Sequence, residues 1–435
     1  MHHSREPELT GRIVVPESPQ YDAARQVFNQ YFNRFPSIIV YAGNTQDVVN
    51  AIRWARCRNV PVRIRSGGHN YEGLSALNNG MVIDMSNMKS IWSDPKRGIA
   101  IVQPGVENNE IYHALGEKGM VVPGGVCPTP AIAGVGLGGG HSMLVRAFGL
   151  TLDHLLEVEM VDASGRILYA NAHRNADLFW ALRGGGGGNF GICTAFCFRT
   201  CPIGTVCMAD IGWSLDDMEP VLKAWQDLTL PGTDKRLTPI LTISSGTAWT
   251  GEAPKTQGEQ PSPVNMQAIY LGPLARLREL LQPLLASGTP QRVLIKELPW
   301  LEAVDRLSAP QPHSRFLSKV PIPLSMGCCL IRPLPSFAAL LTRRLTARLP
   351  FFSTLWEEQL PRFIPGLPLI FTALPGLKSP YGLPGTIRNK LNKTFAGRRV
   401  CVPHCCLIRE VSTSIPPILL SMTGPRPTMA AILET

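Results

Sequence analysis

The stretch Arg65-Ser66-Gly67-Gly68-His69-Asn70-Tyr71 decides how the rest of this chain is interpreted. It directly follows Val60-Pro61-Val62-Arg63-Ile64, whose alternation predicts a short strand that runs into a turn. Backbone amides beside paired glycines can face a phosphate, because no side chain stands in the way. The stretch therefore predicts a turn where the backbone meets a large ligand, with a histidine beside it.

Two more glycine-rich stretches follow along the chain. Cys127 lies in Gly124-Gly125-Val126-Cys127-Pro128-Thr129, and eleven positions after it begins Gly138-Gly139-Gly140. The third stretch runs from Gly184 to Gly188 and continues into Asn189-Phe190-Gly191-Ile192. Considered alone, such a cysteine is more often a small packing residue, and such a histidine a surface or capping residue. Three such stretches together favour a site for a large cofactor.

Four motifs between about Phe35 and Pro202, taken in order, carry a family resemblance: RSGGHNYEG, CPT with its downstream GGG, FGLTLDHLLEVEMVDASG and DLFWALRGGGGGNFGICT. They resemble the FAD-binding domain of the berberine-bridge-enzyme-like oxidases, within the wider vanillyl-alcohol-oxidase superfamily. The resemblance implies an α+β fold, with a two-lobed PCMH-type FAD-binding domain followed by an α+β substrate domain. In that family the histidine of the first motif joins the flavin 8α-methyl carbon, and the cysteine of the second joins ring carbon C6. It therefore implies that His69 and Cys127 hold FAD covalently.

The resemblance also marks the other site residues. Tyr71 is the candidate catalytic side chain, because its position matches a tyrosine near the flavin ring in relatives; a packing aromatic is the alternative. Asn189 is expected to orient the backbone, and Arg183 either to contact the cofactor's phosphates or to form a surface ion pair. The implied cofactor-binding residues are Arg65, Ser66, Gly67, Gly68, His69, Asn70, Cys127, Thr129, Gly134, Gly138, Gly139, Gly140, Gly188, Asn189, Gly191 and Ile192.

A nicotinamide dinucleotide site is the competing explanation of so much glycine. Gly134-Val135-Gly136-Leu137-Gly138-Gly139 nearly matches the G-x-G-x-x-G pattern. No hydrophobic strand leads into it, since Pro128-Thr129-Pro130 lies just upstream, and the next acidic residue, Asp153, lies in a stretch that looks helical. The pattern therefore favours FAD over NAD.

Length and composition limit the class of protein. The 435 residues are enough for two or three domains. The polar N-terminal segment and the lack of eighteen consecutive apolar residues predict no secretory signal, no membrane span and a cytoplasmic location. The 11 cysteines are expected to be reduced thiols. Cys57, Cys193, Cys197, Cys201 and Cys207 are predicted to be packing residues, and no metal site is expected.

Charge is distributed unevenly along the chain. The first 319 residues have 29 basic and 28 acidic residues, whereas the 116 residues from Val320 onward have 13 basic and 4 acidic, with 16 prolines and no aspartate. A basic tail often indicates a nucleic-acid partner. Here no regular face of basic and aromatic residues is present, so we expect no nucleic-acid binding.

The C-terminal 116 residues also lack a sustained helical or strand period and the closing motifs of the family. If plausible codons are assigned from Val320 onward and read one base earlier, three separate stretches give strings similar to the second half of this family. Glu410 to Thr435, for example, can give GGIYVNSTDIAVNDWPEADYGRDIGD. The hypothesis is a frameshift at Lys319/Val320.

The predicted organisation has four parts: a lead-in at 1–34, the FAD-binding domain at 35–202, a partial substrate domain at 203–319 and a poorly ordered, out-of-frame tail at 320–435. The substrate domain is expected to contain an antiparallel sheet with helices on one face. The predicted helices are Tyr21–Phe35, Asn44–Arg56 capped by Asn44, and Pro273–Leu281 ended by Pro283. The predicted strands include Ile83–Met85, Ile99–Gln103, Pro239–Ser244 and Val264–Tyr270.

The implied reaction is the oxidation of a carbon that bears a hydroxyl or an amine. The flavin accepts a hydride from a small-molecule substrate, a protein base takes the proton, and molecular oxygen reoxidises the flavin. The family's base, a tyrosine or glutamate on the substrate-domain sheet, is expected in the part out of frame. An inactive flavin-binding remnant or a pseudogene product is therefore the alternative. Pro130 stands where relatives commonly carry Val or Leu, which leaves oxidase and dehydrogenase behaviour both open, and His141 is expected to face solvent.

Overall fold

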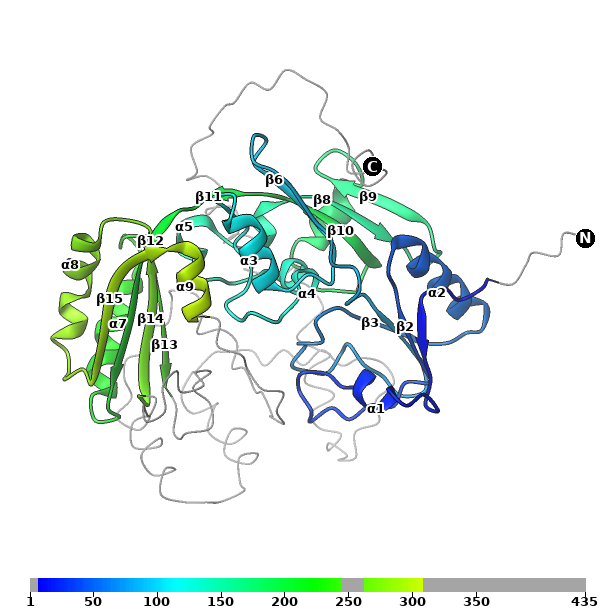
Figure 1. The fold of residues 1–435 in the computed structure, drawn as a ribbon, viewed down its shortest axis with the longest axis horizontal. Helices are drawn as coiled ribbons and strands as arrows, with labels where there is room; N and C mark the ends of the chain where they lie inside the picture. Colours follow the sequence, from blue (N-terminus) through cyan, green and yellow to red (C-terminus); the bar gives the residue numbers. More distant parts are fainter. Residues whose placement is uncertain (1–6, 244–261, 308–435) are drawn as a thin grey trace, which may run out of the picture. The chain divides into compact units, whose positions relative to one another are not determined.

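The computed structural model describes residues 7–243 and 262–307, so the predictions for the tail at 320–435 lie outside the described residues. The described part is α+β (Figure 1). Its first sheet has the order β1-β2-β4-β3, in which β2, β4 and β3 are parallel and β1 is antiparallel to β2. These strands are β1 (Arg12–Val14), β2 (Ile38–Tyr41), β3 (Val62–Arg65) and β4 (Met81–Asp84).

Helix α2 (Thr45–Cys57) covers this sheet, as the sequence predicts. The side chain of Asn44 accepts a hydrogen bond from the backbone of Asp47 and thereby pairs one of the free amides at the helix start. Val48, Val49 and Ala55 on its inner face are buried against the sheet. The helix thereby stabilises the first sheet, whose strand β3 leads into the RSGGHNY turn.

The second sheet is antiparallel and has the order β5-β6-β10-β8-β9. Its strands are β5 (Ile91–Asp94), β6 (Ile99–Val102), β8 (Leu155–Val161), β9 (Ile167–Asn171) and β10 (Ile192–Arg199). The nearby helices are α3 (Asn108–Gly116), α4 (Ile132–Gly138), α5 (Val145–Phe148), a 3-10 helix (Thr151–His154) and α6 (Ala176–Leu182), and a short ladder pairs β7 (Met120–Val121) with β11 (Cys201–Pro202). Cys193 is buried and Cys197 half-buried in β10, the strand that the alternation predicts, so both pack as expected.

A third sheet follows, antiparallel with the order β13-β14-β12-β15. Its strands are β12 (Thr205–Trp213), β13 (Leu237–Ile243), β14 (Val264–Tyr270) and β15 (Arg292–Pro299), and its helices are α7 (Met218–Thr229), α8 (Leu274–Leu285) and α9 (Trp300–Leu307). Because side chains alternate along a strand, Ala209 and Ile211 of β12 pack toward α7 and α8, whereas Val206 and Met208 pack into the core shared with the second sheet.

Three expectations from the sequence are corrected by the fold. Helix α1 covers only Tyr21–Ala24 instead of reaching Phe35. The chain beyond it packs on the first motif instead, where Phe28 donates its backbone N–H to Gly68 and stacks on His69. Helix α8 continues through Pro283 to Leu285, since burial of Leu281 and Leu284 holds its last turn in place. Cys57 is exposed rather than packed, because it ends α2 on the solvent side between two arginines.

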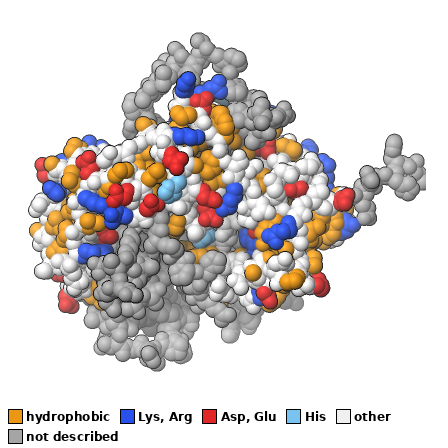
Figure 2. Space-filling view, in the orientation of Figure 1, with side chains coloured by type: hydrophobic (Ala, Val, Ile, Leu, Met, Phe, Trp, Pro, Cys, Tyr) orange, Lys and Arg blue, Asp and Glu red, His pale blue; other side chains and the backbone are white. Residues whose placement is uncertain are grey.

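Charged side chains on the face shown in Figure 2 are mixed in sign, with lysine and arginine beside aspartate and glutamate. This agrees with the nearly equal numbers of basic and acidic residues before Val320. None of the helices in the described part of the chain is long and apolar enough to cross a bilayer.

Candidate functional site

The first two glycine-rich stretches lie against each other. A Cβ atom added to Gly67 would lie 2.6 Å from the backbone nitrogen of Ala131 and 3.2 Å from the carbonyl oxygen of Thr129. The neighbouring Ser66 hydroxyl donates a 2.7 Å hydrogen bond to the carbonyl of Pro104. Glycine at position 67 is therefore required by backbone approach, and the fold joins two motifs that are some sixty residues apart in the sequence.

His69 stacks on an aromatic side chain that the sequence analysis did not identify. Its ring stacks on that of Phe28 with centroids 4.3 Å apart and an interplanar angle of 23°. The centroid of the Tyr71 ring lies 6.4 Å from the centroid of the same phenylalanine ring. Asn70 shapes the turn between them by accepting hydrogen bonds from the backbone amides of Glu72 and Leu74. His69 is half-buried, and Tyr71 is 38% exposed, so a face of each remains open to a ligand.

Cys127 lies close enough to Tyr71 to affect the pKa of its hydroxyl. Burial raises the pKa of Tyr71 and the nearby Cys127 raises it further. Burial likewise raises the pKa of the Cys127 thiol, so that the protonated form dominates at neutral pH. The structure thus brings Tyr71 of the first motif close to Cys127 of the second.

The third glycine-rich stretch lies next to the other two. The backbone amides of Gly184 and Gly186 donate to the carbonyl of Leu137 at the end of α4, over 3.2 and 3.0 Å. A Cβ atom on Gly188, whose φ is +80°, would lie 2.9 Å from the side chain of Ile64 in β3. Asn189 donates from its amide to the carbonyl of Gly185 over 2.6 Å, so it orients backbone as expected.

Helix α4 presents an open, side-chain-free face beside these motifs. Gly134 and Gly138 are one turn apart and exposed, and a Cβ atom at either position would meet nothing within 4 Å. Gly139 and Gly140 then end the helix with φ values of +140° and +81°, which favour glycine. The sequence resembling a dinucleotide-binding pattern lies largely inside α4 instead of in a turn before a helix, which disfavours the NAD interpretation.

Several other site candidates have structural roles. The buried guanidinium of Arg65 pairs with Asp84 and donates to the carbonyls of Ala24 and Gln26, so this side chain belongs to the core of the first lobe. Ile192 is buried at the start of β10. Arg183 is exposed and lies 3.8 Å from Asp153, which corresponds to the surface ion pair. His141 is exposed, as expected.

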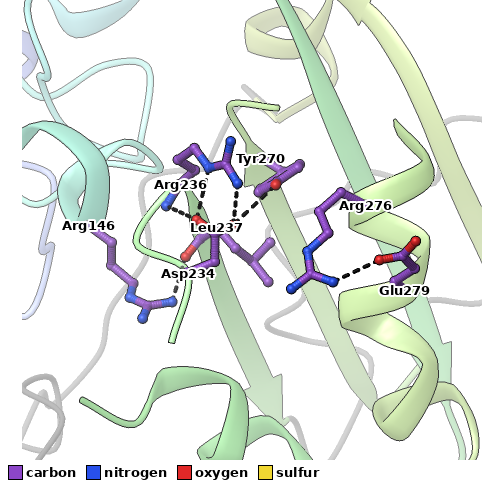
Figure 3. A network of polar contacts seen from close by, with 7 residues as sticks. All are labelled: Arg146, Asp234, Arg236, Leu237, Tyr270, Arg276 and Glu279. Carbon is purple, nitrogen blue, oxygen red and sulfur yellow. Dashed lines mark hydrogen bonds and ion pairs between the residues drawn. The ribbon is translucent and has the colours of Figure 1, made fainter. Parts of the chain in front are cut away.

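A separate cavity of about 710 Å³ lies between α5 and the ends of β12 and β14. It is lined by Phe148, Ile203, Cys207, Arg236 and Glu297 among others, and by none of the residues of the three glycine-rich motifs. Figure 3 shows the polar network beside it, in which Asp234 pairs with Arg236 over 2.6 Å and accepts from the Tyr270 hydroxyl over 3.1 Å.

Next to this cavity, Arg146 links α5 to the third sheet. Its guanidinium donates to the carbonyl of Leu237 over 2.6 Å (Figure 3). It also donates to the hydroxyl of Thr233 over 2.6 Å. The cavity and this link therefore lie between α5 and the third sheet, apart from the residues of the three glycine-rich motifs. Within residues 7–243 and 262–307, no group of three His, Cys, Asp or Glu side chains is placed to hold a metal ion.

Replacing Gly134 by alanine tests whether the open face of α4 contacts a ligand. We expect the stability of the ligand-free protein to stay the same or rise by up to about 1 kcal/mol, because alanine favours a helix and has free space here. Flavin bound per protein is expected to fall, since the added methyl group projects from the bare face. Thermal unfolding together with the flavin absorbance of purified protein gives both results; an unchanged flavin content would show that no cofactor contacts this face.

Comparisons with known proteins agree with this geometry. Residues 36–171 match the FAD binding domain family. The FAD-linked oxidoreductase YgaK of Bacillus subtilis is 40% identical over 307 residues, which are 70% of this chain and 65% of that protein. Berberine bridge enzyme-like 12 of Arabidopsis thaliana is 38% identical over 248 residues, 54% of this chain and 44% of that protein. The chain thus spans less than two thirds of the length of these relatives.

Solved structures show the same fold. BBE-like 1 of Physcomitrella patens has a TM-score of 0.61 at 28% identity, over 70% of this chain and 66% of that one. The carbohydrate oxidase from Microdochium nivale, solved with a substrate analogue, has a TM-score of 0.60 at 26% identity, over 70% of this chain and 65% of that one. The similarity covers most of the residues that the structure describes.

Proposed function

Because the chain belongs to the berberine-bridge-enzyme-like FAD-linked oxidoreductases, we propose that it holds FAD through two covalent bonds, one to His69 and one to Cys127. The observation that carries this proposal is the contact of Gly67 with the backbone from Thr129 to Ala131. That contact fixes the His69 turn beside the Cys127 loop. A single ring system can then reach both side chains, as two attachments require.

The residues around these two side chains fit a flavin dinucleotide. The bare face of α4 at Gly134 and Gly138 leaves room for a group that approaches the backbone closely, such as the diphosphate. The third glycine stretch, hydrogen-bonded to the end of α4, adds backbone without side chains beside the same face. Half-burial of His69 and Cys127 leaves one side of each available for bonding.

The reaction proposed for the complete enzyme is the oxidation of a small-molecule alcohol or amine, with molecular oxygen as the final acceptor. FAD supplies the hydride acceptor when it is bound. Tyr71 stays protonated at neutral pH, because its pKa is raised, and this partly exposed residue is proposed to donate a hydrogen bond from its hydroxyl to a substrate oxygen or nitrogen. Structural similarity to a carbohydrate oxidase supports a hydroxyl-bearing substrate.

An inactive flavin-binding remnant is the second candidate, and the composition after Lys319 favours it for the chain as written. Matches of 307 and 308 residues to two relatives fit within the 319 residues before the proposed frameshift. The following 116 residues carry 13 basic and 4 acidic residues, unlike the balanced part before them. In this case the chain would bind FAD without turnover, because the base expected on the substrate sheet would be missing.

The attachment proposal is tested by unfolding purified protein in denaturant and asking which peptides keep flavin. We expect the wild-type chain to keep flavin on peptides containing His69 and Cys127, the His69→Ala and Cys127→Ala variants to keep it on one peptide each, and the double variant to release all of it. Cys201→Ala is the matched control, since Cys201 is half-buried outside the motifs. Complete release of flavin from the unfolded wild-type protein would refute covalent attachment.

A further inference from the structure

Helix α3 lies under the Cys127 loop and carries the bonds that hold it. The backbone amides of Asn108 and Asn109 donate to the carbonyls of Pro130 and Pro128, over 3.1 and 3.0 Å. The side-chain amide of Asn108 donates to the carbonyl of Cys127 itself over 2.9 Å. Among these contacts, this side-chain bond is the one that reaches the cysteine residue.

The glycines before Cys127 make room for this asparagine. A Cβ atom on Gly125 would overlap the side-chain nitrogen of Asn108, and one on Gly124 would lie 2.9 Å from its side-chain oxygen. The sequence alone suggested that this pair of glycines faces a cofactor. In the structure they lie over a side chain that is 0% exposed.

One turn further along α3, Tyr112 also forms hydrogen bonds with the Cys127 loop. Its hydroxyl donates to the carbonyl of Gly125 over 2.8 Å and accepts from the amide of Gly124 over 3.1 Å. Trp300, at the start of α9 in the substrate domain, packs edge-on against the Tyr112 ring with centroids 5.5 Å apart. Tyr112 thus supports the loop as part of the domain core, whereas Asn108 contacts the cysteine residue directly.

We propose that Asn108 is a positioning residue that sets Cys127 in place for bonding to the flavin; this rests on the covalent attachment proposed above. The attachment forms a bond from the sulfur to ring carbon C6 and breaks the S–H bond and the C–H bond at C6. The two hydrogens leave as two protons and two electrons, which molecular oxygen takes up to become hydrogen peroxide. Asn108 takes no part in this transfer and fixes the backbone from which the sulfur projects.

The test compares the two attachments in one protein. In full-length Asn108→Ala, the fraction of Cys127 peptide that carries flavin is expected to fall about tenfold or more, since a displacement near 1 Å can cost about two orders of magnitude in rate. The fraction of His69 peptide that carries flavin is expected to stay at the wild-type value. A loss that reflects general misfolding would lower both fractions together and would overturn the proposal.

Two further variants make the test specific. Asn108→Leu keeps the size of the side chain without its donor and should lose the Cys127 attachment as well. Asn109→Ala is the matched control, because Asn109 has a buried side-chain oxygen without a partner and holds the loop only through its backbone. Equal Cys127 attachment in wild type and both Asn108 variants would overturn the role of Asn108.

An assay that needs no flavin distinguishes a failure of the proposed role of Asn108 from a failure of covalent attachment. If wild-type protein carries no flavin on either residue, covalent attachment fails, and the rate of Cys127 alkylation by N-ethylmaleimide then reports the loop position. Asn108→Ala is expected to react several-fold faster than wild type and Asn109→Ala, because a released loop exposes the thiol. Equal alkylation rates in all three proteins would contradict the proposal.

Discussion

A gene in which a single-base change at the Lys319/Val320 junction restores the other reading frame is expected to give a markedly more soluble and more stable protein than the chain as written. Within the described residues, β13 and β15 each pair with a strand on one side only, and Val293 on β15 is 50% exposed. Unpaired strand edges and exposed apolar residues promote aggregation. A second half of the family's substrate domain would supply residues to cover them.

The size of this effect follows from burial. Each apolar side chain that becomes fully buried contributes about 1.5–3 kcal/mol, and each kcal/mol gained raises the midpoint of thermal unfolding by roughly 2–4 °C in a domain of 150–250 residues. We therefore expect an increase of about 10 °C or more, together with hydrogen peroxide production from a panel of alcohols, sugars and amines. Soluble yield, thermal unfolding and a peroxide assay measure these outcomes.

The control is a gene with the same base change and a compensating change a few codons later, which returns the tail to the sequence as written. This control should behave like the original chain. If the restored gene gives no gain in yield, melting temperature or peroxide production over this control, the frameshift hypothesis is wrong.

Replacing Gly67 by alanine is expected to cost about 1–3 kcal/mol of stability and to abolish flavin binding, because the new methyl group would overlap backbone that cannot move aside. Its Cβ would stand 2.6 Å from the nitrogen of Ala131, which continues directly into α4. The two motifs would have to separate, which would move His69 away from Cys127. Chemical denaturation and flavin absorbance measure the two effects.

Gly43→Ala is the matched control for this change. A Cβ atom there would make an ordinary contact of 3.6 Å with the Asp47 carboxylate, and the backbone hydrogen bond from Gly43 to that carboxylate would be kept. We expect its stability within about 0.5 kcal/mol of wild type and full flavin content. A Gly67→Ala protein as stable and as rich in flavin as this control would contradict the close approach of the motifs.

The α+β class and many elements were predictable from local pattern, because hydrophobic periodicity and helix caps are short-range properties. Asn44 and the apolar face after it predicted α2, and the alternation at 264–270 predicted β14. The early end of α1 was not predictable in this way, since the chain after it is held by the packing of Phe28 on His69, far away in the sequence. The candidate site residues were predicted from motif resemblance, and that method did not indicate Asn108, which lies outside every motif.

The order and spacing of the glycine-rich motifs were enough to mark this chain as a flavoprotein of its family, because glycine turns and the residues beside them carry the cofactor chemistry locally. The sequence could not tell which glycines leave open space and which allow another part of the chain to approach closely. In the folded chain Gly134 and Gly138 lie open, whereas Gly67 meets Ala131 and Gly125 meets Asn108. A glycine has no side chain to reveal its neighbour, so its role depends on what the distant chain brings against its backbone.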